Sequence, residues 1–231
     1  MNALKQTLNR AKQTVDEKIG GAEKTELDPD VAKQLARIDD IKLYTEKTLS
    51  NVQAYLQPDP TLRILPGMIE ESANKPECVG IDMGHLGTKL GSSDNYGKAM
   101  VRGSEAFNKL GQAEREFLSA ASNRYVDPLK RFLNEDMKKL QQERSGLENK
   151  RLDMDLLKSK AKKDAGNADL ESQAKASSDA YNQQLELVRQ LSKGIDDRLP
   201  ELQQALRVFV EAQIDYVGKV QQILKDFHKQ L

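Results

Sequence analysis

The side chains that most often carry catalysis or bind metals are scarce in this sequence. It contains two histidines, His85 and His228, and one cysteine, Cys78. Neither histidine has cysteine or carboxylate neighbours at the spacing of metal ligands, and no phosphate-binding glycine loop or nucleophile motif is present. We therefore expect a protein that is not an enzyme and needs no metal or cofactor. A single cysteine excludes an internal disulfide and favours a reducing, intracellular compartment.

The chemistry that the residue types do indicate, near the N-terminus, is contact with lipid. Within residues 1–20, apolar side chains recur three or four positions apart and fall in an arc of about 80° on a helix. This N-terminal stripe consists of Leu4, Leu8, Ala11, Val15 and Ile19. It is flanked by Lys5, Lys12 and Lys18, whose ammonium groups can reach lipid phosphates. The pattern predicts an amphipathic helix with membrane-inserting apolar residues and headgroup-binding lysines. The alternative is a helix that packs on the body of the protein through this stripe.

A second cationic feature lies between positions 124 and 163, which hold twelve Lys or Arg against seven Asp or Glu. The excess is concentrated at Lys158, Lys160, Lys162 and Lys163. Lysines at a helix C-terminus either bind anionic headgroups or are solvated and favour the helix end through its dipole. We expect headgroup contact if the long helices of the protein place these lysines at the tip of a curved rod.

A third candidate for lipid contact lies within residues 58–95, where prolines and glycines are dense and predict an irregular insert. It is an apolar cluster beside Arg63, a further candidate headgroup ligand, and its members are Leu62, Ile64, Leu65, Met68 and Ile69. The cluster either dips into lipid or packs as an ordinary loop. Gly80, Gly84, Gly87 and Gly91 are spaced like a small-residue packing face, but in this context we expect a mobile loop.

Three long helices must position these features. The sequence predicts the first at about 28–57, with Asp28 as N-cap and Pro29 at the first helical position, the second at about 96–163, and the third at about 169–231. The composition agrees, with 31% charged and 5% aromatic residues and no Trp. Helices of ~65 residues are on the order of 100 Å long, which predicts an elongated, all-α rod. A dimer of such rods would bury the apolar flank that one rod exposes.

The third predicted helix carries a heptad seam with polar exceptions at Ser192 and Gln213, which either fix the register or face solvent. The seam consists of Val188, Ile195, Leu199, Leu202, Leu206, Phe209, Tyr216, Val220, Ile223 and Phe227. Pro128 and Pro200 are expected to kink the second and third helices, because each lacks a backbone donor. The alternative, that Pro200 breaks the third helix, is disfavoured because the seam stays in phase through it.

Six collinear segments resemble the endophilin family. They are the Gly-Gly junction within 19–28, Leu-Gln-Pro-Asp-Pro at 56–60, Tyr-Gly-Lys-Ala at 96–99, Asp-Pro-Leu at 127–129, Arg-Leu-Asp-Met-Asp at 151–155 and Val-Glu-Ala-Gln-Ile-Asp-Tyr at 210–216. The resemblance is to the N-BAR domain, closest to the endophilin B type. It departs from the family at Pro66-Gly67, where a short membrane-dipping helix would be expected.

The resemblance implies a BAR domain: a three-helix antiparallel coiled coil that forms a crescent-shaped homodimer with a central six-helix bundle. It further implies an N-terminal amphipathic helix at 1–20, a BAR domain at 21–231 and a basic concave face that binds anionic phospholipid membranes. Family members end in an SH3 domain, and none is expected within this chain. Heterodimers with related BAR proteins are a further partner class, and roles in membrane trafficking and endocytosis follow from the family.

Two functional hypotheses therefore stand. The first is a peripheral protein of intracellular membranes, reached from the cytoplasm, that senses or generates curvature by tubulation. The second is a dimeric coiled-coil scaffold or tether that binds partner helices without deforming a membrane. No stretch approaches the ~20 apolar residues that cross a bilayer. Nucleic acid is not expected as a partner, because neither a basic stripe with interleaved aromatics nor a recognised nucleic-acid-binding module occurs.

Overall fold

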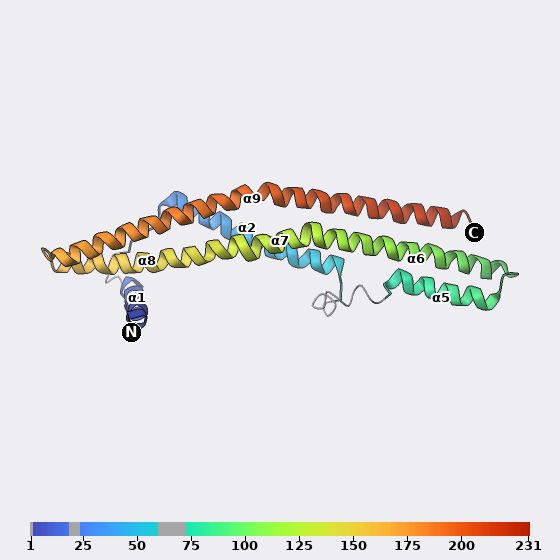
Figure 1. Cartoon of the computed structure of the whole chain (residues 1–231), viewed down its shortest axis with the longest axis horizontal. Helices are drawn as coiled ribbons and strands as arrows, with labels where there is room; N and C mark the ends of the chain where they lie inside the picture. Colours follow the sequence, from blue (N-terminus) through green and yellow to red (C-terminus); the bar gives the residue numbers. More distant parts are fainter. Residues whose placement is uncertain (1, 19–23, 60–72) are drawn as a thin grey trace. The chain divides into compact units, whose positions relative to one another are not determined.

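The computed structural model of the chain describes residues 2–18, 24–59 and 73–231, which contain helices and no strand (Figure 1). The all-α class is therefore confirmed. The α-helices are α1 (Asn2–Lys18), α2 (Pro29–Leu56), α5 (Lys75–Leu90), α6 (Asn95–Ala121), α7 (Asp127–Arg131), α8 (Lys138–Lys163) and α9 (Ala168–His228). Two π-helical segments, η1 (Ser122–Val126) and η2 (Phe132–Met137), lie before and after α7.

Contacts divide the chain into two compact units. The first unit is Met1–Tyr44 with Arg131–Leu199, and the second is Thr45–Lys130 with Pro200–Leu231. The long helices α2 and α9 each contribute one part to either unit.

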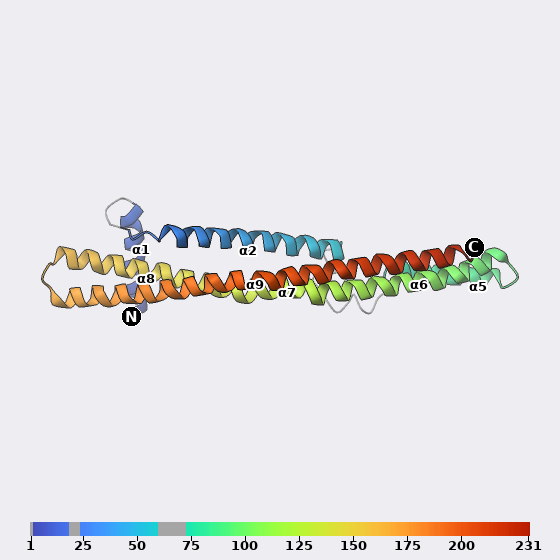
Figure 2. The same cartoon turned by 90° about the horizontal axis from the view of Figure 1, so that it is seen from above.

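In the first unit, α8 and the first part of α9 lie side by side, as both views show (Figures 1 and 2). The first part of α2 packs on them through Val31, Leu35 and Ile38, which recur at helical spacing and are buried. The other buried apolar side chains of this unit include Phe132, Met137, Leu140, Leu147, Leu152, Met154, Tyr181, Val188 and Ile195. Ion pairs add polar links from α2, between Arg37 and Asp196 of α9 and between Arg144 of α8 and Asp39.

In the second unit, α5 and α6 are neighbours and pack through small residues (Figure 1). A side chain placed on Gly80 would meet Asn108 and the backbone of Ser104, and one on Gly87 would meet Val101. The expectation of an irregular insert with a mobile glycine loop is therefore wrong for residues 75–90. Gly80, Gly84 and Gly87 form the small-residue packing face instead, because their missing side chains allow the two backbones to approach closely, whereas Gly91 is the C-cap of α5.

The start of α5 is fixed by its own sequence and by α6. Asn74 caps the helix by accepting from the Glu77 backbone N–H at 3.1 Å, while Glu77 accepts from the Asn74 N–H at 3.0 Å. This reciprocal arrangement is a capping box, followed by Pro76 in the first turn. Arg115 of α6 donates to Glu77 at 2.9 Å, and the Asn74 side-chain amide donates to the Gly111 carbonyl. These contacts offset the low helix propensity of a glycine-rich segment.

The core of the second unit is aromatic and lies between α6, η1 and the last part of α9. The Tyr125 and Phe209 rings stack with centroids 4.9 Å apart, and the Phe117 and Tyr216 rings stack at 5.1 Å. Leu129 and Ala205 complete this cluster. Phe209 and Tyr216 belong to the predicted heptad seam, so the seam packs within the chain.

The two prolines lie inside helical segments. Pro128 is the second residue of α7, directly after η1, where the Asp127 N–H reaches the Ser122 carbonyl in the wider π pattern. Such a bulge accommodates a proline, which lacks a donor and crowds the preceding turn. Pro200 lies within α9, which continues through it, so the alternative of a broken third helix is wrong. The bends at Pro128 and Pro200 stay predictions.

Candidate functional site

Helix α1 crosses α8 in the first unit rather than running along it (Figure 2). The residues of α1 that face α8 are polar. Arg10, Gln13 and Glu17 recur at helical spacing and form one side of α1, and Gln13 is only 3% exposed. No role was predicted for these three residues from the sequence.

Two bidentate ion pairs hold α1 to α8. Arg10 donates through Nε and Nη2 to the two carboxylate oxygens of Asp153, at 2.9 and 2.6 Å. Arg151 donates through Nη1 and Nη2 to the two oxygens of Glu17, at 3.0 and 2.9 Å. Paired N–H···O bonds of this kind fix orientation as well as distance. The cation comes from α1 in the first pair and from α8 in the second, so each helix contributes one cation and one anion.

Arg151 is the centre of this junction and is only 4% exposed. Besides Glu17 it donates to Glu148 and Asp155 of its own helix, at 2.8 Å in each case. Asp155 in turn accepts from the backbone N–H and the hydroxyl of Thr25, at 3.0 and 2.5 Å. A buried guanidinium is stable only when its donors are paired, and here three carboxylates pair with it.

The junction shifts the pKa values of its members. Hydrogen bonds from Arg151 hold the pKa of Glu17 and that of Glu148 below the ordinary value of 4.5, against the opposing effect of burial. The same bonds, first to Glu148 and then to Glu17, raise the pKa of Arg151. The hydrogen bond to Asp153 raises the pKa of Arg10. All four groups are therefore charged at neutral pH.

The described side chains of the N-terminal stripe, Leu8, Ala11 and Val15, point away from this junction. Leu8 is 65% exposed and Val15 is 52% exposed, and Ala11 and Lys12 are exposed as well. Packing of α1 through its apolar stripe, the alternative considered above, is therefore wrong for these residues, because the opposite, polar side makes the contacts. Leu4, Lys5 and Lys18 lie within α1, and Ile19 lies outside the described residues. Membrane insertion of the stripe stays a prediction.

The basic end of α8, formed by Lys158, Lys160, Lys162 and Lys163, is exposed throughout. It follows the junction on the same helix, since Lys158 is five residues and Lys163 ten residues after Asp153. At 1.5 Å per residue this end lies about 7 to 15 Å beyond the α1 contact along the helix axis. Lys158 comes seven residues after Arg151 and so lies on the same side of α8.

The apolar cluster of the insert lies outside the described residues, together with its neighbouring arginine. This applies to Leu62, Arg63, Ile64, Leu65, Met68 and Ile69. Their lipid contact stays a prediction.

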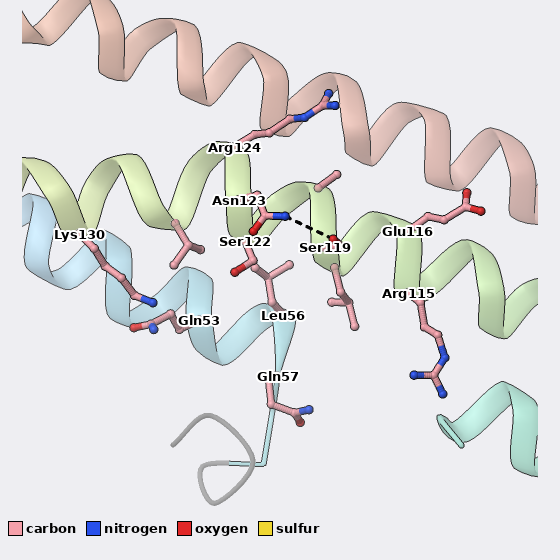
Figure 3. Close-up of a pocket in the computed structure, with 13 residues that line it drawn as sticks. Gln53, Leu56, Gln57, Arg115, Glu116, Ser119, Ser122, Asn123, Arg124 and Lys130 are labelled. Atoms are coloured by element: carbon pink, nitrogen blue, oxygen red, sulfur yellow. Dashed lines mark hydrogen bonds between the residues drawn. The ribbon is translucent and has the colours of Figure 1, made fainter. Parts of the chain in front are cut away.

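The second unit contains a hollow of about 870 Å³, lined by the end of α2 and by α6, η1 and α7 (Figure 3). Its cationic residues include Arg115, Arg124 and Lys130. Arg115 points toward α5, where it pairs with Glu77, and Glu116 pairs with Lys219. No histidine or cysteine is among the described lining residues.

The described residues contain no group of three or more His, Cys, Asp or Glu arranged to hold a metal ion. None of the helices in the described ranges combines the length and the apolar character that crossing a bilayer requires.

A family model described as "BAR domain" matches residues 4–231. The chain belongs to the BAR domain family. It is also similar to endophilin-B1 of Bos taurus and of Homo sapiens, at 34% identity over 97% of this chain in both cases. Endophilin-B2 of Mus musculus is 31% identical over 96% of the chain. The chain spans about 64% of the length of the endophilin-B1 relatives.

Membership of the family supports a role in sensing or generating membrane curvature, and BAR domains in general dimerise and bind membranes. It points to a structural protein rather than an enzyme. The resemblance stated from the sequence is thereby confirmed for the family and for the similarity to endophilin B.

This BAR domain leaves a second apolar surface uncovered, in the second unit. The α9 stripe consists of Leu206, Val210, Ile214, Val217 and Leu224, which are all exposed. Their spacing of three, four and seven residues places them on one side of α9. Of this stripe only Leu206 was singled out from the sequence, as a member of the buried heptad seam. The structure buries its neighbour Ala205 at this point of the seam and exposes Leu206, because the apolar pattern shifts around the helix by one position.

The two polar exceptions of the predicted seam have different surroundings. Ser192 is buried, at 1% exposure, and its Oγ has no hydrogen-bond partner among the described residues. Gln213 accepts from the Tyr55 hydroxyl at 2.9 Å. Solvent exposure is therefore excluded for Ser192, and a role of either residue in register stays a prediction.

Proposed function

We propose that this BAR domain binds anionic phospholipid membranes peripherally and senses or generates their curvature as a homodimer. The observation that carries the proposal is the exposed apolar pair Leu8 and Val15 on α1, held on the same helix that ends in four exposed lysines. Apolar side chains next to lysines suit the boundary between acyl chains and headgroups. The lysines of the basic end and Lys12 would bind headgroup phosphates, and the N-terminal stripe would enter the leaflet.

The energies favour binding by more than one copy. Full burial of one aliphatic side chain is worth about 1.5 to 3 kcal/mol, and each lysine near an anionic surface about 1 kcal/mol. A shallow helix realises only part of the first contribution. One copy would therefore bind weakly, whereas a dimer presents two stripes and two basic ends to one surface and gains avidity.

The α9 stripe supports the homodimer. Its apolar residues are interspersed with charges of both signs, since Arg207 is followed by Glu211 and Asp215. A surface that carries charges of both signs does not favour anionic lipid, and a second copy of the same stripe would bury its apolar side chains. A related BAR protein with a similar stripe would fit in the same way.

Insertion of several apolar side chains into one leaflet expands that leaflet. We therefore expect the dimer to convert vesicles into tubules at high protein density. The place of action that the resemblance to the endophilin B type implies is the surface of intracellular membranes.

The second candidate function is a dimeric coiled-coil scaffold that binds partner helices and no lipid. The observation that favours it is again the α9 stripe, which would accept an amphipathic helix from another protein. This candidate leaves the exposed Leu8 and Val15 without a role.

Cosedimentation with vesicles separates the two candidates. The full chain should pellet with vesicles that contain phosphatidylserine and remain in the supernatant with phosphatidylcholine alone, and added salt should weaken binding. Leu8→Glu should reduce binding at least tenfold, because it places a charge in the apolar stripe. A matched control is Gln204→Glu, which creates the same carboxylate at an exposed position of α9.

Equal recovery in the supernatant with both lipids would favour the scaffold and contradict the proposal. Equal loss of binding in Leu8→Glu and Gln204→Glu would show that overall charge, not the stripe, determines binding. Negative-stain images of the pelleted vesicles test tubulation separately.

A further inference from the structure

Helix α1 contacts α8 through its polar side, which is the reverse of the usual arrangement. A helix on the surface of a protein ordinarily buries its apolar side and exposes its polar side. Here Gln13 and Glu17 face α8, while Leu8 and Val15 are exposed. Apolar burial therefore contributes little to holding α1, and the charged contacts with α8 must do so.

The residues of α8 that receive α1 are organised within their own helix. Arg151 is oriented by Glu148, three residues before it, and by Asp155, four residues after it. Both of these contacts are within one helix, so they need no help from α1. The guanidinium is thus placed to pair with a further carboxylate, which Glu17 supplies.

The same group of residues also holds the chain beyond α1. Asp155 accepts two hydrogen bonds from Thr25, and the Glu17 pair lies next to it on Arg151. Glu17 and Thr25, which are eight residues apart, are therefore both bound to one turn of α8. Asp153 adds a third point of attachment through Arg10.

We propose that Arg151, Asp153 and Asp155 form an intramolecular binding site, the α8 socket, whose ligand is the polar side of α1. The socket holds α1 on the body in the absence of lipid and keeps the N-terminal stripe outward. Docking as such is independent of the proposed function, whereas the purpose of the outward stripe rests on it. Because α1 is already helical and oriented, membrane binding need not include the ordering of this segment.

Amide hydrogen exchange of the lipid-free full chain tests the socket. An isolated helix of this length is only marginally stable in water, so an undocked α1 would exchange at nearly the rate of an unfolded peptide. We expect amides of α1 to exchange at least tenfold more slowly than that. Arg10→Asp should abolish the protection, because it places two carboxylates against each other, and Asp153→Arg should do the same.

The double variant Arg10→Asp with Asp153→Arg is the matched control, because it restores an ion pair of reversed polarity and the net charge of the original chain. It should regain most of the protection of α1. Exchange in α9 around Val188 should be unchanged in all three variants, which shows that the body remains folded.

Unprotected α1 in the original chain would overturn the socket, as would full protection in Arg10→Asp or failure of the double variant to recover. Vesicle binding is measured separately. If α1 is unprotected and vesicles are still bound, the socket is wrong and the proposed function stands. If α1 is protected and no vesicle is bound, the proposed function is wrong and the socket stands.

Discussion

Two apolar stripes, one in each unit, lie in different electrostatic surroundings. The N-terminal stripe on α1 lies beside Lys12 and near the basic end of α8, and α1 is attached by ion pairs. The α9 stripe alternates with residues of both charges and belongs to a helix whose other side packs on an aromatic core. The amount of exposed apolar surface does not by itself identify the partner that binds there. The charge around each stripe distinguishes an anionic lipid surface from a second protein surface.

The largest expected effect concerns the α9 stripe. Ile214→Asp places an unpaired charge where we expect a second copy to pack, and burial of such a charge costs several kcal/mol. The dimer dissociation constant should rise by about 100-fold or more. Sedimentation equilibrium measures this directly.

Gln204→Glu is the control for this variant, because Gln204 is exposed and lies on another side of α9. It should leave the dimer intact. A dimer of unchanged affinity in Ile214→Asp would show that the α9 stripe is not the dimer surface. It would contradict the assignment of the two stripes to different partners.

The next effect concerns the basic end of α8. Replacing Lys158, Lys160, Lys162 and Lys163 by glutamine should weaken binding to phosphatidylserine vesicles by roughly ten- to a hundredfold, which corresponds to about half of them lying near the surface at about 1 kcal/mol each. The remaining binding should depend less on salt, because fewer charges contact the membrane. Self-association should not change. Unchanged vesicle binding would remove this end from the lipid contact.

A smaller effect is expected from pH, through the α8 socket. Hydrogen bonds from Arg151 lower the pKa of Glu17, and these bonds exist only when α1 lies on α8, so the ionised form of Glu17 stabilises the docked state. That stabilisation is complete above the ordinary value of 4.5 and is lost as the pH falls through the lowered pKa of Glu17. Amide protection of α1, corrected for the intrinsic exchange rate, should therefore be constant near neutrality and decrease below pH 4.5.

Glu17→Gln provides the reference for the pH experiment. It keeps the shape of the side chain but removes the carboxylate that pairs with Arg151, so protection should be lower at neutral pH and vary less with acidification. An identical pH profile in both proteins would exclude Glu17 from the docking contact.

The smallest effect concerns Ser192, which lies buried in the first unit without a hydrogen-bond partner among the described residues. Ser192→Ala removes an unpaired hydroxyl and adds a better helix former, so it should stabilise the protein by about 1 kcal/mol. The midpoint of thermal unfolding should rise by roughly 2 to 4 °C. A decrease would indicate that this hydroxyl has a partner in the dimer.

The parts of the fold that depend on local pattern could be predicted. The stop signals around Pro58 and the apolar periodicity delimit α2, and the Asp28 side chain accepts from the N–H groups of Asp30 and Val31, as an N-cap should. The spacing of Leu8, Ala11 and Val15 indicated one apolar side of α1, and the structure places all three on the exposed side.

The rest depends on contacts between distant residues. Helix α5 was missed because its glycines have low helix propensity, and only their close packing against Ser104 and Asn108 of α6 explains them. Glu17 and Arg151 are 134 residues apart, and nothing in either segment alone indicates that they pair. The polar spacing of Arg10, Gln13 and Glu17 was the one local signal that could have indicated a docking side.

The central claim, that the N-terminal stripe meets lipid while its polar side stays on α8, is tested most directly by a fluorophore on the stripe. With the exposed Cys78 replaced by alanine, an environment-sensitive nitrobenzoxadiazole group is attached at Leu8→Cys or, for reference, at Gln204→Cys. Phosphatidylserine vesicles should shift the emission of the label at position 8 to the blue, and brominated acyl chains should quench it, with no change at position 204. Unchanged emission at position 8 with vesicles that the protein demonstrably binds would contradict the account.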